Sequence, residues 1–158
     1  MTKILFINPS LRLHSQTKFL PVGIASVMSF LRHHGVNYDL LDIDINSIED
    51  DQIESFLENN RYDIVCSGSI VTHYKWMKWL TRIVRKYNPK SKIIVGNSVA
   101  GSIPTLFLAN SDADIAIIGE GEITTLELLL KMLRNEDWCK VDGIAFKNTN
   151  GVVKVNEK

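Results

Sequence analysis

A short turn of alternating small and acidic residues, Gly119-Glu120-Gly121-Glu122, carries the clearest chemical potential in the sequence. An unbroken apolar run, Ile115 to Ile118, precedes the turn, and leucines at helical spacing follow it. Glycine allows positive φ and a close approach to a ligand, whereas carboxylates stabilise the amino end of a helix. The pattern therefore predicts either a ligand-binding turn or a tight strand-to-helix turn whose acids serve only the helix.

Two further turns combine small residues with hydroxyl or amide groups, and each follows an apolar run. Such groups can hold a large, mostly uncharged ligand through backbone contacts, but they include no acid–base pair. A small hydrolase or transferase is therefore disfavoured. The residues of these two turns are Ser67, Gly68, Ser69, Gly96 and Asn97.

Several common catalytic motifs are missing from the sequence. No Gly-x-x-x-x-Gly-Lys-Ser/Thr or Gly-x-Ser-x-Gly occurs, and the first strand is not followed by a glycine fingerprint for a dinucleotide. The two cysteines, Cys66 and Cys139, can form neither a disulfide framework nor a cysteine metal cluster. Adjacent His33 and His34 point in different directions on a helix, which disfavours a shared metal.

The formal net charge is zero, and hydrophobic residues make up 45% of the chain. This balance argues against nucleic acid or an anionic membrane as the main partner. No apolar run approaches the length of a membrane span, which takes about 20 residues. The chain also enters a strand pattern at once, without a signal peptide, so we expect a cytoplasmic protein.

Five apolar strand patterns alternate with amphipathic helices, which predicts a parallel sheet covered on both faces. The expected fold is α/β and flavodoxin-like: a doubly wound parallel five-stranded sheet of order 2-1-3-4-5 with a C-terminal β-hairpin. In the hairpin, Asn150-Gly151 would supply the turn. The expected strands cover residues 3–7, 37–43, 63–67, 92–95 and 114–118.

All parallel strands end at the same edge of such a sheet, so the loops that follow them converge there. Ligands of this fold lie over that edge, near the switch between the first and third strands. The loop 8–20 is long for a strand-to-helix connection, which is typical of a functional segment. The converging loops are 8–20, 67–73, 96–102 and 119–122.

The chain resembles the N-terminal cobalamin-binding domain of B12-dependent radical SAM proteins. The helix pattern Pro-x-Gly-(Leu/Ile) within residues 20–35, the strand 62–69, the turn 94–101 and Gly119-Glu120-Gly121-Glu122 carry this resemblance. Cys66 and Gly68 depart from the strand pattern. By this resemblance the turn 94–101 faces the cofactor, and in it Asn97 replaces the second glycine and Val99 replaces a histidine.

The resemblance implies a corrinoid lying over the carboxyl edge, lined by Ser67, Gly68, Ser69, Gly96, Asn97, Gly119, Glu120 and Gly121. No histidine has an aspartate two residues before it, so the Asp-x-His-x-x-Gly motif that supplies a cobalt ligand in mutase-type domains is missing. We therefore predict no cobalt ligand from that motif. His14 lies in the loop 8–20 and remains a candidate ligand.

Radical SAM chemistry needs Cys-x-x-x-Cys-x-x-Cys, which Cys66 and Cys139 cannot provide. We therefore expect the 4Fe-4S cluster and S-adenosylmethionine in a missing radical SAM domain, in cis or in trans, of a methyltransferase or cyclase. The expected cobalamin-binding domain covers residues 1–140, and the hairpin 141–158 would lead to that missing domain. The alternative is an interaction or regulatory module of the same fold that has lost the cofactor.

Overall fold

A seven-stranded sheet, ordered β2-β1-β3-β4-β5-β6-β7, forms the centre of the computed structural model, which describes residues 2–156. Strands β1 to β5 run parallel, whereas β6 and β7 pair antiparallel at the β5 edge. The α/β fold and the order 2-1-3-4-5 are confirmed, but the sheet has seven strands rather than five. The strands are β1 (Ile4–Asn8), β2 (Asp39–Asp42), β3 (Ile64–Gly68), β4 (Lys92–Gly96), β5 (Ile115–Ile117), β6 (Ile144–Lys147) and β7 (Val153–Asn156).

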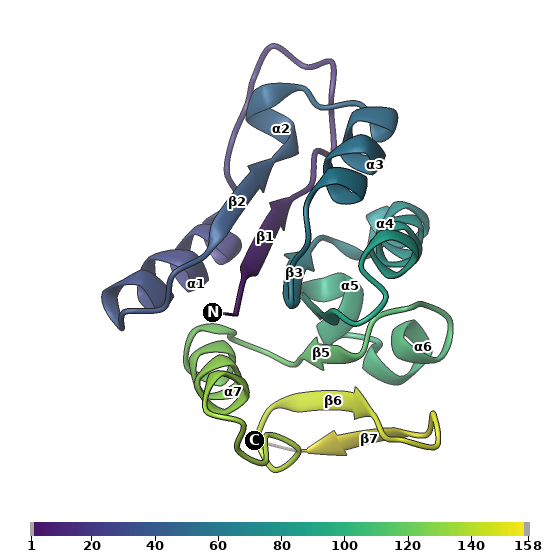
Figure 1. The fold of residues 1–158 in the computed structure, drawn as a ribbon. Coiled ribbons are helices and arrows are strands. Elements are labelled where there is room, and N and C mark those ends of the chain that lie inside the picture. Colours follow the sequence, from purple (N-terminus) through teal and green to yellow (C-terminus); the bar gives the residue numbers. More distant parts are fainter. Residues whose placement is uncertain (1, 157–158) are drawn as a thin grey trace.

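Helices cover both faces of the sheet (Figure 1). Two long helices lie on one face, and four helices lie on the other. Helices α1 (Val22–His33) and α7 (Glu122–Leu133) form the first group. The second group is α3 (Asp50–Asn59), α4 (Tyr74–Tyr87), α5 (Ser98–Gly101) and α6 (Pro104–Ala109). The short α2 (Ile43–Asn46) and the 3-10 turn η1 (Val71–His73) follow the ends of β2 and β3.

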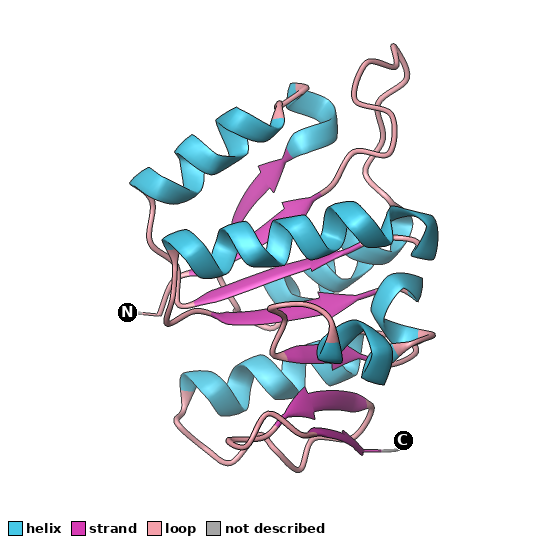
Figure 2. Ribbon diagram, turned by 90° about the vertical axis from the view of Figure 1, so that its right-hand side faces the viewer, coloured by secondary structure: helices cyan, strands magenta, loops and turns pink. Residues whose placement is uncertain are grey.

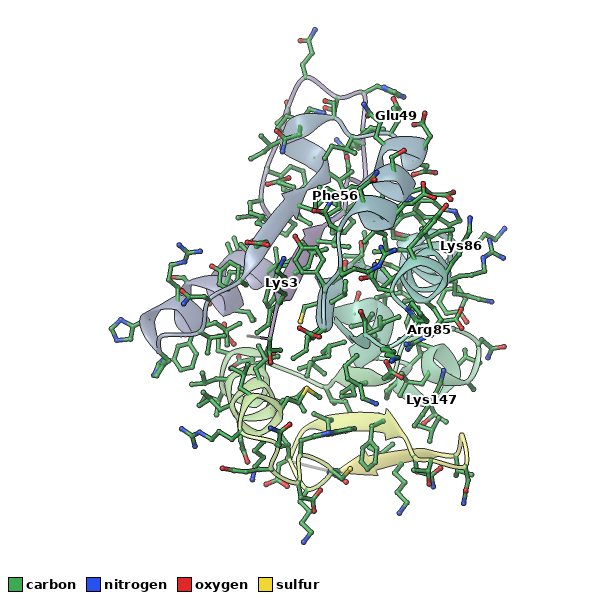
Figure 3. All side chains as sticks on the ribbon, in the orientation of Figure 1. Lys3, Glu49, Phe56, Arg85, Lys86 and Lys147 are labelled. Carbon is green, nitrogen blue, oxygen red and sulfur yellow. The ribbon has the colours of Figure 1, made fainter. Side chains whose placement is uncertain are left out.

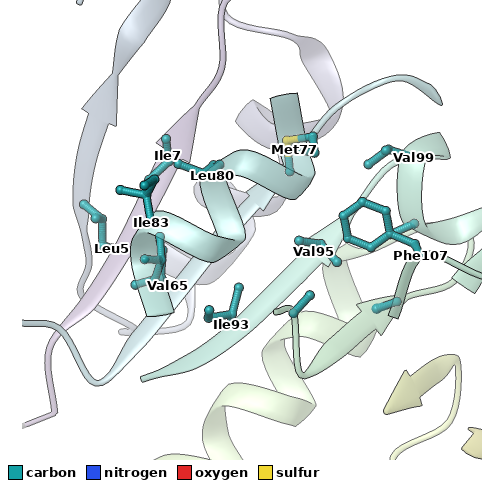
Figure 4. Close-up of a cluster of buried hydrophobic side chains, with 14 of the residues drawn as sticks. Leu5, Ile7, Val65, Met77, Leu80, Ile83, Ile93, Val95, Val99 and Phe107 are labelled. Carbon is teal, nitrogen blue, oxygen red and sulfur yellow. The ribbon is translucent and has the colours of Figure 1, made fainter. Parts of the chain in front are cut away.

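The sheet separates two hydrophobic cores because successive strand residues point to opposite faces. Leu5 and Ile7 of β1 belong to the core under α4 and α6, which also contains Leu80 and Phe107 (Figure 4). Ile4 and Phe6 belong to the other core, which lies under α1 and α7. Buried residues of β1, β3, β4, β5 and β6 occur in both cores, so these strands serve two packing layers.

The C-terminal hairpin extends the sheet because β5 would otherwise end it as an open edge. Ile144 and Ala145 are fully buried, and Ala145 pairs with Ala116 of β5. At the end of β6, Lys147 Nζ donates to the Ser111 carbonyl at 2.6 Å, and its side chain lies near Arg85 of α4 (Figure 3). These contacts fix the hairpin to the body of the domain.

The connection in the hairpin is one residue longer than the expected connection from Asn148 to Gly151, in which Asn150-Gly151 would supply the turn. Residues 148–152 connect β6 to β7, and Gly151 has a φ of 75°. Asn148 Oδ1 accepts hydrogen bonds from the amides of Asn150 at 3.0 Å and Val152 at 2.9 Å. The side chain of Asn148 thus organises a longer turn than the Asn-Gly pair alone would predict.

Strand β2 is shorter than predicted because Asp42 starts the short helix α2. The Asp42 side chain accepts from the Ile45 amide at 3.0 Å and from Asn8 Nδ2 at 3.0 Å. An aspartate that caps a helix in this way ends the extended run. Within residues 2–156, no helix is both long and apolar enough to cross a membrane.

Candidate ligand-binding cavity

A cavity of about 390 Å³ lies between α1, α7 and the carboxyl ends of the strands. Its floor comes from the sheet: Phe6 pairs with Cys66 in register, and Cys66 pairs with Ile94. Ile117 of β5 completes the floor. These side chains belong to the α1–α7 core, so the cavity is a part of that core which the helices leave unfilled.

Helix α1 forms one wall of the cavity, through Pro21, Gly23, Ile24 and Val27. Pro21 directly precedes the helix, where its fixed φ and missing amide hydrogen do no harm. A Cβ atom added at Gly23 would find no heavy atom within 4 Å. The absent side chain therefore keeps this wall open.

The turn before α7 forms the opposite wall, through Gly119, Glu120, Gly121 and Glu122. Gly119 has a φ of 75°, which favours glycine. A Cβ at Gly121 would lie 3.2 Å from Val27 Cγ2 of the facing helix, so glycine lets the two walls approach each other. The sequence pattern of two glycines thus has a structural reason at both positions.

Gly68 and Gly96 pair where β3 and β4 end. A Cβ at Gly68 would lie 2.8 Å from the Gly96 carbonyl oxygen, which is closer than real Cβ contacts. A Cβ at Gly96 would instead lie 3.9 Å from Ile117 Cβ on the cavity floor. Gly68 is therefore required for strand packing, whereas Gly96 leaves space in the cavity.

Asn97 adopts an unusual backbone conformation, with φ 63° and ψ −172°. This region is almost restricted to glycine, so it is not the αL conformation that asparagine tolerates well. Asn97 Oδ1 accepts from the Ser98 amide at 2.6 Å and caps the short helix α5. The cap partly offsets the strain of a side chain at a position suited to glycine.

The charged residues lining the cavity are Glu120 and Glu122. Ser26 Oγ of α1 donates to Glu122 Oε1 at 2.6 Å, which joins the two helices that flank the cavity. Among the described residues that line the cavity, none is a lysine, arginine or histidine. The cavity thus suits a neutral group with apolar faces better than a strongly anionic one.

The structure brings all but one of the expected site residues to this cavity. Ser67, Gly68, Gly96, Asn97, Gly119, Glu120 and Gly121 line it. Ser69 does not: it is buried, and its Oγ lies 3.0 Å from His73 Nδ1. His73 stacks on Trp76, and burial lowers the pKa of His73 although the nearby Asp50 charge raises it. Ser69 therefore belongs to a neighbouring polar contact.

Two other residues that the sequence analysis singled out, Val99 and His14, do not line the cavity. Val99 is fully buried in the core on the opposite face of the sheet, so it does not face a ligand in this cavity. His14 is exposed, and its Nδ1 lies 3.9 Å from Glu49 Oε1. Of the two departures in the turn 94–101, only Asn97 therefore borders the cavity.

The long loop that carries His14 is held at both ends by Asp44 (Figure 2 shows the loop extending beyond the sheet). Ser10 Oγ donates to Asp44 Oδ1 at 2.5 Å, and the Phe19 amide donates to Oδ2 at 2.9 Å. Burial raises the pKa of Asp44, but these two hydrogen bonds and the Lys18 charge lower it more, so the pKa lies below its ordinary value of 3.8. Asp44 is therefore a charged anchor for the loop.

Sequence reasoning missed the apolar floor because a residue that lines a cavity has the same sequence pattern as a core residue. The sequence likewise predicts Thr125 only as a helix residue. The floor residues can be recognised from the register of the strands, because Phe6, Cys66 and Ile94 form one row near the strand ends. Within residues 2–156, no three His, Cys, Asp or Glu side chains gather as a metal site.

Comparison with known proteins gives matches in both sequence and structure. A family model described as a B12 binding domain matches residues 10–129. An uncharacterized protein from Methanocaldococcus jannaschii is 32% identical over 115 residues, which cover 73% of this chain and 21% of that protein. Cytidylyl-2-hydroxyethylphosphonate methyltransferase from Streptomyces wedmorensis is 23% identical over 174 residues, covering 97% of this chain and 33% of that enzyme.

The same fold occurs in a solved structure of the cobalamin-dependent S-adenosylmethionine radical enzyme OxsB with aqua-cobalamin bound. The TM-score is 0.82 at 23% identity, and the match covers 99% of this chain and 22% of OxsB. At this identity the likeness shows the fold alone. The chain spans only 21% and 33% of the length of the two curated relatives.

Proposed function

Because the chain belongs to the B12-binding domain family, we propose that it holds cobalamin over the carboxyl edge of its sheet. The observation that carries this proposal is the cavity of about 390 Å³ between α1 and α7, with glycines in its walls and an apolar floor. In this arrangement the aromatic base of the nucleotide tail would enter the cavity, and the lining residues at the strand ends would hold the macrocycle outside it.

The residues present fit such a cofactor. The cavity falls in the size range of small-ligand pockets, which is about 300–1,000 Å³, so it suits a nucleotide tail and not a complete corrinoid. Its apolar floor suits a flat aromatic base. Next to the lining residues, Val22 and Ile123 are 84% and 73% exposed, and they provide apolar surface for the macrocycle.

Cobalt would supply the chemistry, by carrying a methyl group in a methyltransferase. The chain lacks the Asp-x-His-x-x-Gly motif, so no cobalt ligand comes from that source. His14, in the loop 8–20, remains the candidate ligand. The electronic spectrum of the reconstituted protein, compared with that of His14→Ala, tests whether His14 ligates cobalt. An imidazole-type spectrum that disappears in the variant would overturn the prediction that the bound corrinoid has no protein ligand.

The complete enzyme is proposed to be a radical SAM methyltransferase or cyclase. A radical SAM domain, in cis or in trans, would provide the 4Fe-4S cluster and bind S-adenosylmethionine. Residues 1–140 would form the cobalamin-binding unit, with 141–158 leading toward the catalytic domain. The free, exposed thiol of Cys139 fits the reducing cytoplasm expected from the sequence.

Titration with hydroxocobalamin tests the proposal, using Gly96→Val as the variant that blocks the cavity. Gly96 lies two residues after Ile94 on the same strand, and its Cβ would point toward Ile117. Lys92→Val is the matched control, because it lies on the same strand but at the amino edge.

We expect wild type and Lys92→Val to bind with a Kd below about 100 μM, and Gly96→Val to bind at least about tenfold more weakly, a loss of ~1.4 kcal/mol. Circular dichroism would show that both variants fold. Equal binding by Gly96→Val, or no binding by wild type at ~100 μM, would reject cofactor binding in this cavity and favour the cofactor-free interaction module.

A further inference from the structure

Cys66 lies in the middle of the cavity floor, between its register partners Phe6 and Ile94. Its side chain is almost completely buried, and its thiol is free. Burial raises the pKa of the Cys66 thiol, so it stays protonated at neutral pH. The thiol therefore behaves as a small apolar group with a weak hydrogen-bond donor and not as a thiolate ligand.

The rest of the strand floor offers little hydrogen bonding to a ligand. Phe6, Ile94 and Ile117 have apolar side chains. The Ser67 hydroxyl also lines the cavity, but it already donates to the Ile7 carbonyl at 2.9 Å. Cys66 is thus the floor residue at which a nearly isosteric replacement, serine, can raise the polarity of the floor.

We propose that this floor selects corrinoids by the base of their nucleotide tail, and that the weak polarity of position 66, where Cys66 stands, maintains the selection. The preferred tail carries an apolar aromatic base, such as a dimethylated benzimidazole, and a purine base is disfavoured. This inference rests on the proposed corrinoid-binding function and deepens it. It assigns Cys66 a specificity role and no catalytic role.

The selection follows from desolvation. A purine such as adenine has ring nitrogens and an amino group that hydrogen-bond to water. Against this floor they would lose water, and the side chains of Phe6, Ile94 and Ile117 offer them no partner. One unsatisfied buried group weakens binding by about tenfold or more. A dimethylated benzimidazole loses less hydration and gains contact with Phe6 and Ile94.

Two substitutions at Cys66 separate polarity from size. Cys66→Ser is nearly isosteric but supplies a hydroxyl that donates and accepts strong hydrogen bonds. Cys66→Ala removes the sulfur and keeps the floor apolar. Cys139→Ser is the matched control, since Cys139 is exposed and does not line the cavity.

The experiment measures the Kd of three corrinoids for wild type and each variant. They are hydroxocobalamin, its adenine-tailed analogue, and cobinamide, which lacks the nucleotide tail. Cobinamide reports contacts with the macrocycle alone. We expect wild type, Cys66→Ala and Cys139→Ser to bind hydroxocobalamin about tenfold or more tightly than the adenine-tailed form. Cys66→Ser should reduce this ratio severalfold and leave cobinamide binding unchanged.

The possible results separate the proposed base selection from the proposed corrinoid binding. If wild type binds no corrinoid, the proposed function fails and the inference falls with it. If wild type binds both tailed forms equally, base selection is overturned while corrinoid binding stands. A ratio that changes equally in Cys66→Ser and Cys66→Ala, or that stays unchanged in Cys66→Ser, would also overturn the role of Cys66. The wild-type comparison needs no variant, so it remains decisive if Cys66→Ser fails to fold.

Discussion

The two faces of the sheet use the same strands in opposite ways near the carboxyl edge. On the α4–α6 face, Val99 and Phe107 are fully buried and fill the space above the strand ends. On the α1–α7 face, the strand residues Phe6 and Ile94 are also buried, but they line a cavity. A ligand site therefore arises here without any loss of burial in the sheet.

The two faces differ in the segments that cover the strand ends. After β4, the short helices α5 and α6 fold over one face and insert Phe107. On the other face, glycines stand among the lining residues, including Gly23 and Gly96, and leave space that no side chain fills. Local packing thus decides which face is a core and which is a site, and substitutions on each face test that division.

The largest expected effect is the loss of packing at Phe107. Phe107→Ala should lower the free energy of unfolding by about 3–5 kcal/mol, because a fully buried ring leaves a cavity. Phe6→Ala should cost about 1 kcal/mol less, since one side of that ring already borders empty space and has fewer contacts to lose. Urea denaturation measures both changes. A larger cost at Phe6 than at Phe107 would contradict the contrast between the faces.

Asp44 tests whether the loop 8–20 is anchored independently of both cores. Asp44→Asn should cost about 2 kcal/mol at neutral pH, because it removes a charged acceptor of two hydrogen bonds. The folded pKa of Asp44 is below 3.8, so its stabilisation is present above that pH and is lost as pH falls through the lower folded pKa.

Denaturation of wild type and Asp44→Asn at pH 6 and near pH 3 measures this dependence. The gap between the two proteins should shrink at the lower pH. A gap that widens in acid would show that the charged form of Asp44 is not what holds the loop.

Substitution of the two glycines at the ends of β3 and β4 should change stability less, and the two positions should differ. Gly68→Ala should cost about 1–3 kcal/mol, because its Cβ would meet the Gly96 carbonyl at 2.8 Å. Gly96→Ala should be close to neutral, because its Cβ enters the cavity. Thermal denaturation of the two variants tests the pair; similar losses would mean that the cavity side is as tightly packed as the strand side.

Asn97→Gly is the smallest change and should be stabilising. Relief of backbone strain should contribute about 1 kcal/mol, reduced by loss of the cap to the Ser98 amide. Asn97→Ala serves as the control, since it loses the cap and keeps the strain, and it should be destabilising. Loss of stability in Asn97→Gly would show that the cap outweighs the strain.

Much of the fold can be predicted from local sequence patterns. Apolar runs and helical spacing predict the parallel strands and long helices, and the glycines in 119–122 indicate the correct edge. The sequence does not separate Phe6 from Leu5 as a cavity residue, because both are apolar strand residues and only the placement of helices distinguishes them. The turn pattern misplaces Val99 for the same reason: its burial depends on α6, which lies outside the local pattern.

The most direct test of the cavity is the electron paramagnetic resonance spectrum of the Co(II) form of cobalamin bound to His14→Ala protein. A tail base that lies in the cavity cannot also ligate cobalt, so the spectrum should show no nitrogen splitting from that base. Splitting from the tail base in the bound cofactor would place the base on cobalt and outside the cavity, and would contradict the proposed binding mode.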